Sequence, residues 1–122
     1  MRGAMAKEIL PTDIVQRQLD AYNARDIEAF LDVFSDTAEA GDLGAKTPAI
    51  VGKEQLRQRY GDLFARSPNL HSALVSRTAL ANVVVDHERI TGRDGSAEPY
   101  EVLAINEVRD GLIHRVFFVR NQ

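Results

Sequence analysis

Residues 98–120 read EPYEVLAINEVRDGLIHRVFFVR, and this stretch decides the fold. It contains two long runs of β-type sequence, 98–109 and 112–120, separated by Asp110-Gly111. Asp and Gly tolerate the backbone angles that a two-residue reversal demands, so the pair predicts a tight β-hairpin. The two runs are therefore expected to lie side by side as antiparallel strands.

The same pattern continues toward the N-terminus. Two more β-type runs, 70–80 and 83–92, are separated by Ala81-Asn82, and Asp94-Gly95 separates the second of them from the stretch above. Tight hairpins at these separators would join four strands into an antiparallel meander. Strands of about ten residues span about 33 Å, and a sheet of that length twists and curls, so its concave face needs a cover.

Three amphipathic segments can provide that cover. Helices are predicted to start with Thr12 and Asp26 as N-caps, and a third helix is predicted over about 53–65. Short strands are expected at 38–43 and 49–51. The predicted apolar stripes of the three helices are Ile14, Val15, Leu19 and Tyr22; Ile27, Phe30, Val33 and Phe34; and Leu56, Tyr60, Leu63 and Phe64. The sequence thus predicts an α+β domain with helices packed on one face of a curved, mainly antiparallel sheet.

Length and composition limit the class of protein. The 122 residues suffice for one domain, which we expect over 12–122 after a flexible lead-in over 1–11. The chain carries 15 Lys and Arg against 18 Asp and Glu, so neither nucleic acid nor a membrane is an expected partner. With no Cys there is no disulfide, thiolate metal site or cysteine nucleophile, which fits a reducing cytoplasm.

The histidines give no sign of a metal site. The chain has three, His71, His87 and His114, and they lie on three different predicted strands without ligand-like spacing. No glycine-rich dinucleotide fingerprint or nucleophile elbow occurs either. We therefore expect neither a metal nor a cofactor.

The order of several loose motifs resembles that of a known family. The motifs are YNARDIEAF at 22–30, Phe34-Ser35-Asp36, and Gly52-Lys53-Glu54-Gln55-Leu56 followed by Tyr60, after which the four strands come. Over roughly 12–122 this order resembles the SnoaL-like, nuclear transport factor 2-like proteins. The resemblance implies a cone-shaped, cystatin-like α+β barrel with an interior cavity, often dimerised through the outer face of its sheet. Isomerases, cyclases, hydrolases, dehydratases and scaffolding proteins share this fold, so it does not settle the activity.

Comparison with the ketosteroid isomerases of that family suggests a catalytic carboxylate. Asp42 stands where those enzymes keep their general base, although Gly41-Asp42-Leu43-Gly44 also reads as an ordinary turn. Gln18 and Ala104 stand where the isomerases keep the two oxyanion donors. Loss of one such donor costs about 3–4 kcal/mol of transition-state stabilisation, so we do not expect a working ketosteroid isomerase.

The same resemblance turns further strand residues toward the cavity. The expected catalytic residues are Asp42, Asp86 and Glu88. The expected substrate-binding residues are Tyr100, Asn106, Phe118 and Arg120 on the strands, together with Tyr22 and Tyr60 on the predicted helices. Alternation groups Asp86 and Glu88 on one face of their strand but does not say whether that face is inside. If it is, the like charges should raise the pKa of at least one carboxyl group. Alternatively, the two acids simply pair with Arg77 or Arg120 on neighbouring strands.

Two functions remain open at this point. The first is a cofactor-free enzyme that acts on a small apolar molecule by proton transfer. The second is a ligand-binding or assembly module in which the sheet face does the work. An apolar outer face carrying Ile113, Phe117 and Val119 would be costly in water, so it favours a homodimer.

Overall fold

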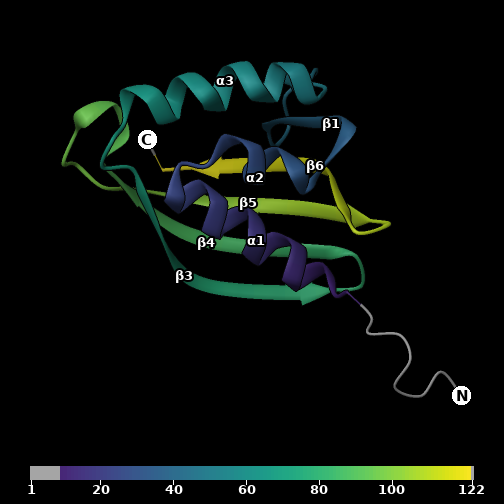
Figure 1. Cartoon of the computed structure of the whole chain (residues 1–122). Coiled ribbons are helices and arrows are strands. Elements are labelled where there is room, and N and C mark those ends of the chain that lie inside the picture. Colours follow the sequence, from purple (N-terminus) through teal and green to yellow (C-terminus); the bar gives the residue numbers. More distant parts are fainter. Residues whose placement is uncertain (1–8, 122) are drawn as a thin grey trace, which may run out of the picture.

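The structure is a computed structural model, and it describes residues 9–121 (Figure 1). Its helices are α1 (Pro11–Ala24), α2 (Ile27–Asp32) and α3 (Lys53–Arg66). Its strands are β1 (Phe34–Asp42), β2 (Ile50–Val51), β3 (His71–Leu80), β4 (Val83–Thr91), β5 (Tyr100–Arg109) and β6 (Leu112–Arg120). The predicted α+β class is confirmed: three helices pack on one face of a six-stranded sheet.

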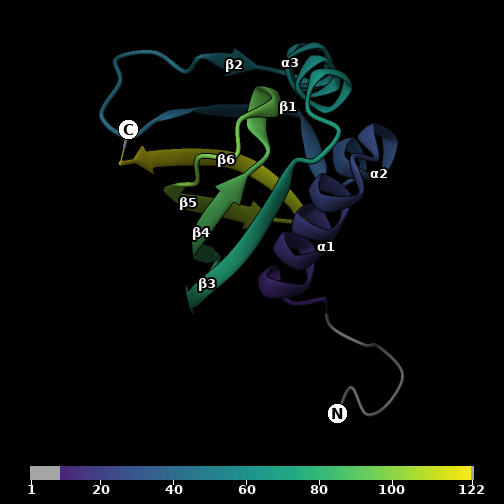
Figure 2. The same cartoon turned by 90° about the vertical axis from the view of Figure 1, so that its left-hand side faces the viewer.

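The strands follow the order β2-β1-β6-β5-β4-β3 in the sheet. The four strands from β3 to β6 form the predicted antiparallel meander, and β1 runs parallel to β6. The sheet curves strongly, and α1 and α2 lie against its inner face while α3 packs beside β1 and β2 (Figure 2). This arrangement leaves the inner face of the sheet partly enclosed.

Two of the three predicted tight turns are present. Ala81 and Asp110 adopt left-handed φ angles of 53° and 54° in the β3–β4 and β5–β6 hairpins. The prediction of a two-residue hairpin at Asp94-Gly95 is wrong, because residues 92–99 form a longer loop with a short 3₁₀ turn, Arg93–Gly95. A Cβ atom at Gly92 would lie 2.1 Å from the carbonyl oxygen of Asn69, so this loop packs tightly against the backbone before β3.

The helix termini show one correction and one confirmation. Pro11 is the first residue of α1 and Leu10 is its N-cap, so Thr12 is not the cap and the helix already includes the end of the expected lead-in. A proline suits this first helical position because its φ is fixed and its missing N–H would have no helical partner. Asp26 does cap α2, and its carboxylate accepts a hydrogen bond from the Ala29 N–H at 3.1 Å. The remaining lead-in, residues 1–8, lies outside the described residues.

A β-bulge in β6 corrects the predicted outer face. Glu107 pairs with Arg115 and Val108 pairs with Ile113, so His114 is an extra residue in the strand. The extra residue reverses the alternation, and Ile113 is fully buried in the core instead of lying on the outer face. Phe117 and Val119 keep the predicted outward direction, because Val116 and Phe118 beside them face the core.

Candidate functional site

A cavity of about 260 Å³ lies between the inner face of the sheet and the helices α1 and α3. Most of the residues predicted for the site line it. These are Asp42, Glu88, Tyr22, Tyr60, Tyr100, Asn106, Phe118 and Arg120. Asp86 does not line the cavity, so the prediction that it faces a substrate is wrong.

Strand register places the lining residues in rows across the sheet. Glu88 on β4 pairs with Val102 on β5, which in turn pairs with Arg120 on β6. In the next row Asp86 is paired with Ala104, and the row continues through Phe118 to Asp42. Residues paired in this way share one face of a sheet. The alternation left open by the sequence is thereby resolved, since the face of β4 that carries both acids points inward.

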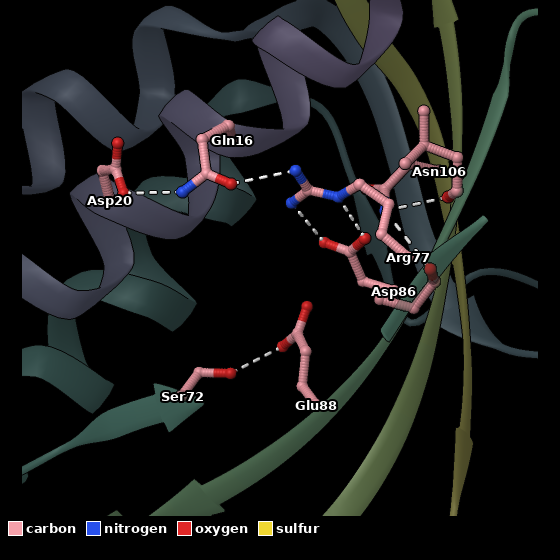
Figure 3. Close-up of polar contacts among 9 residues, drawn as sticks. Gln16, Asp20, Ser72, Arg77, Asp86, Glu88 and Asn106 are labelled. Atoms are coloured by element: carbon pink, nitrogen blue, oxygen red, sulfur yellow. Dashed lines mark hydrogen bonds and ion pairs between the residues drawn. The ribbon is translucent and has the colours of Figure 1, made fainter. Parts of the chain in front are cut away.

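Asp86 is held in a buried ion pair. Its carboxylate has no solvent exposure and accepts two hydrogen bonds from the Arg77 guanidinium, Nε to Oδ1 at 2.7 Å and Nη2 to Oδ2 at 2.9 Å. Arg77 also donates to Gln16 Oε1 at 2.9 Å, and Gln16 donates to Asp20, so the pair is tied to α1 (Figure 3). The alternative interpretation of Asp86, as a partner of Arg77, is the one that the structure bears out.

Glu88 has a different environment although it lies two residues further along the same strand. Its side chain is 9% exposed, and Oε1 accepts a hydrogen bond from the Ser72 hydroxyl at 2.8 Å (Figure 3). Burial raises the pKa of Glu88 to about 7, while the Ser72 hydrogen bond opposes the rise and the charge of Asp86 adds to it. The carboxyl group is therefore able both to give and to take a proton near neutral pH.

Ser72 is a site residue that the sequence interpretation missed. The Asn23 side chain on α1 holds the backbone of Ser72 with two hydrogen bonds. Asn23 Oδ1 accepts from the Ser72 N–H at 2.8 Å, and Asn23 Nδ2 donates to the Ser72 carbonyl at 3.0 Å. Its inward direction follows from its pairing with Ile90, which lies on the same inner face as Glu88. The position of Ser72 could have been found only from the register of β3 against β4.

Three tyrosines supply hydroxyl groups to the cavity. Tyr22 and Tyr60 pack edge-on at a ring-centroid distance of 6.4 Å, and within residues 9–121 neither hydroxyl has a hydrogen-bond partner. Burial raises the pKa of Tyr60 to about 12, although the charges of Arg120 and Arg93 act in the opposite direction. Tyr100 accepts a hydrogen bond from Arg93 at 2.8 Å, so its own proton is free to be donated.

Asn106 lines the cavity beside the tyrosines. Its amide nitrogen donates to the backbone carbonyls of Val84 and Ala104, both at 3.3 Å. In residues 9–121 the amide oxygen has no hydrogen-bond partner, and the residue lines the cavity although it is only 3% exposed. It can therefore accept a hydrogen bond from a ligand.

Asp42 lies at the mouth of the cavity, at the end of β1. Its carboxylate oxygen Oδ1 accepts a hydrogen bond from Arg120 Nη1 at 2.6 Å, and its side chain is 65% exposed. Arg59, Arg66 and Arg93, which were not among the predicted residues, also line the cavity. The sequence composition did not point to these arginines, because the chain as a whole is acidic.

Neither a metal site nor a membrane-crossing helix is found in the part of the chain that the structure describes. No group of three or more His, Asp or Glu side chains in residues 9–121 is placed to hold a metal ion. Within the same range no helix is long and apolar enough to span a bilayer.

Comparison with known proteins gives the family. The model of the SnoaL-like domain matches residues 15–116, and the chain therefore belongs to the SnoaL-like domain family. No curated protein matches the sequence.

Solved structures share the fold. An uncharacterised cystatin-fold protein from Novosphingobium aromaticivorans has 25% identity and a TM-score of 0.84, with 93% of this chain and all of that chain covered. A proposed polyketide cyclase from Sinorhizobium meliloti has 20% identity and a TM-score of 0.74 over 88% of this chain and 94% of its own. A hypothetical protein with a ketosteroid isomerase-like fold from Catenulispora acidiphila, solved in complex with trimethylamine, has 18% identity and a TM-score of 0.74 over 91% of this chain and 86% of its own. The resemblance inferred from the sequence motifs is confirmed at the level of family and fold.

Proposed function

We propose that the chain is a small-molecule enzyme of the isomerase, cyclase or lyase type, and that Glu88 transfers the proton. One observation carries the proposal: a nearly buried carboxyl group with a pKa of about 7 faces a cavity lined largely by apolar and aromatic side chains. A carboxyl group with these properties is matched to acid and base chemistry near neutral pH. The kinship with a proposed polyketide cyclase supports the same class of reaction.

The roles of the other residues follow from where they lie. The Glu88 carboxylate takes a proton from the carbon next to a substrate carbonyl, and the resulting acid returns it to another carbon. Meanwhile the hydroxyls of Tyr22, Tyr60 and Tyr100 can donate to the oxygen that gains negative charge. Tyr22 lies one helical turn beyond Gln18, so the tyrosines offer donors in place of the two that the ketosteroid isomerases use.

Asp42 keeps a place in the proposal as the alternative base. It lines the same cavity, but its carboxylate is more exposed than that of Glu88 and is held by Arg120. Asp86, which sequence had grouped with these two acids, has no part in the proposal because Arg77 occupies both of its oxygens.

Proton transfer can be tested without knowledge of the natural substrate. A panel of small cyclic ketones and β-keto esters is incubated with the protein in D₂O, and deuterium incorporation next to the carbonyl is followed by mass spectrometry. We expect catalysed exchange that falls by about 10²–10⁴-fold in Glu88→Gln, the usual contribution of a general base. Asp42→Asn tests the alternative base and should retain most of the exchange if Glu88 is the base. If Asp42→Asn loses exchange and Glu88→Gln keeps it, Asp42 is the base; if no ketone exchanges, the enzymatic proposal fails.

A second proposal concerns assembly, because an apolar patch lies on the outer face of the sheet. Cross-strand pairs bring its members together: Leu103 with Val119, and Ile105 with Phe117. We propose that this patch joins two copies of the chain as a homodimer, since contiguous apolar surface is unfavourable in water. Sedimentation velocity at micromolar concentration should give a dimer, and Phe117→Lys should give a monomer with an unchanged circular dichroism spectrum. A wild-type monomer at that concentration contradicts the dimer.

A further inference from the structure

Positive charge collects around the cavity although the chain as a whole is acidic. Four arginines line the cavity, Arg59, Arg66, Arg93 and Arg120, against the carboxyl groups of Asp42 and Glu88. The whole chain has a formal net charge of −3. The cavity therefore attracts anionic ligands, although the negative charge of the chain as a whole would repel them.

Within the part of the chain that the structure describes, neither Arg59 nor Arg93 donates a hydrogen bond to a carboxylate. In residues 9–121 the nearest protein acceptor of Arg59 is the Ala49 carbonyl at 3.5 Å. Arg93 donates Nη1 to the neutral Tyr100 hydroxyl, and its nearest carboxylate, Asp94 at 4.0 Å, is already paired with Arg66. The Arg93 side chain is 38% exposed, so several of its five N–H donors remain for a ligand at the cavity.

Two of the arginines lie beside aromatic rings of the cavity lining. The Arg93 guanidinium lies 5.9 Å from the Tyr100 ring centroid, and that of Arg120 lies 5.0 Å from the Phe118 centroid. Both rings also line the cavity. A ligand that contacts a guanidinium therefore has aromatic surface directly beside it for an apolar group.

Strand register places both of these arginine–aromatic pairs near Glu88. Tyr100, the partner of Arg93, pairs with Ile90, which lies two residues beyond Glu88 on β4. Arg120, Val102 and Glu88 are successive partners on β6, β5 and β4. Neighbouring strands are about 4.8 Å apart, so the backbones of Arg120 and Glu88 are separated by about 10 Å. One small ring system or a short acyl chain spans that distance.

We propose that the ligand of this cavity is an apolar carboxylic acid, bound with its carboxylate at Arg93 and with its apolar body between Phe118, Tyr60 and Glu88. The inference deepens the proposed function, since it names the class of substrate for the same cavity. It concerns binding, however, and is tested without turnover. A carboxylate accepts two parallel hydrogen bonds from a guanidinium, which a neutral or cationic ligand of the same shape does not do.

Isothermal titration calorimetry with ligands that differ only in charge tests the proposal. The probes are 2-naphthoate, its neutral amide 2-naphthamide, and the cation 2-naphthylmethylammonium, with octanoate as an acid of different shape. We expect an acid to bind at least about tenfold more tightly than the amide, the effect of one charge-assisted hydrogen bond, and the amine to bind most weakly. Arg93→Met should lower the affinity for the acid about tenfold or more and leave that for the amide unchanged.

Arg115→Met is the matched control, because Arg115 lies on the outer face of β6 and pairs with Glu107 at 2.9 Å. It should alter neither affinity. Equal binding of acid and amide, tighter binding of the amine, equal losses for both ligands in Arg93→Met, or no binding of either acid would each overturn the proposal. The two proposals fail separately in the wild-type protein: acid binding without any ketone exchange removes the enzyme and leaves the acid site standing, whereas ketone exchange without acid binding removes the acid site alone.

Discussion

Asp86 and Glu88 lie two residues apart on the inner face of β4, and their carboxyl groups have different partners. Both are almost completely withdrawn from solvent. Asp86 accepts two hydrogen bonds from a guanidinium, whereas Glu88 accepts one from the Ser72 hydroxyl. Both groups are buried, and the main difference between them is the residue that each one faces across the strand pair.

An irregularity in β3 determines those partners. Leu74 pairs with Glu88, but Ser76 pairs with His87 and Arg77 with Asp86, so Val75 is an extra residue in the strand. In a regular ladder Ser76 would lie opposite Asp86 and Arg77 would point to the outer face. The bulge thus gives Asp86 its guanidinium and leaves Glu88 beside an apolar leucine. One inserted residue thus gives one strand an ion-paired carboxyl group and a carboxyl group without a charged partner.

The largest effect is expected when the Asp86 pair is broken. Asp86→Asn leaves the Arg77 guanidinium, which is 17% exposed, facing an amide that cannot neutralise it. Removal of one partner of a buried ion pair costs about 3–5 kcal/mol, and we expect a loss of that size in the free energy of unfolding measured with urea. By contrast, Glu88→Gln should not destabilise the protein at pH 7, because Glu88 has no charged partner.

A double variant sharpens this expectation. Asp86→Leu combined with Arg77→Met replaces the pair by apolar side chains and should recover most of the lost stability, since such replacements are often neutral. If Asp86→Asn unfolds at the same urea concentration as the wild type, the ion pair does not distinguish the two acids.

The fold could be predicted to a large extent from the sequence because it depends on local patterns. The alternation in 98–120 and the turn pair Asp110-Gly111 specify the hairpin on their own. The loop over 92–99 could not be predicted, because its course depends on the close approach of Gly92 to the distant Asn69. The misplacement of Ile113 has a similar cause: alternation continues correctly only until a bulge shifts it.

The site was harder to predict than the fold. Of the nine site residues predicted from the sequence, eight line the cavity, and Asp86 is the exception. Which of the two acids is ion-paired depends on pairing across β3 and β4, and a bulge such as that at Val75 has no signature in a single sequence. Arg93 was also missed, because it lies in the loop over 92–99, whose course depends on tertiary contacts.

Glu88 should make the stability of the protein depend on pH. Its pKa is raised from 4.5 to about 7 in the folded protein, so the folded state holds the proton more tightly than the unfolded state. The resulting stabilisation is complete below pH 4.5 and is lost as the pH rises through about 7. The loss amounts to at most about 3 kcal/mol, and Glu88→Gln should not show it. Urea unfolding from pH 5 to 8.5 should therefore give similar stabilities at the acid end and a more stable variant at the alkaline end.

Ser72→Ala serves as the matched control, because it removes the hydrogen bond that favours the ionised form of Glu88. The fall in stability relative to Glu88→Gln should then extend to higher pH, since the pKa of Glu88 rises further without the hydroxyl. Other groups titrate equally in all three proteins, so the differences between them report on Glu88 alone. Parallel curves for wild type and Glu88→Gln would mean that the carboxyl group has an ordinary pKa, and the contrast with Asp86 would then be one of contacts and not of chemistry.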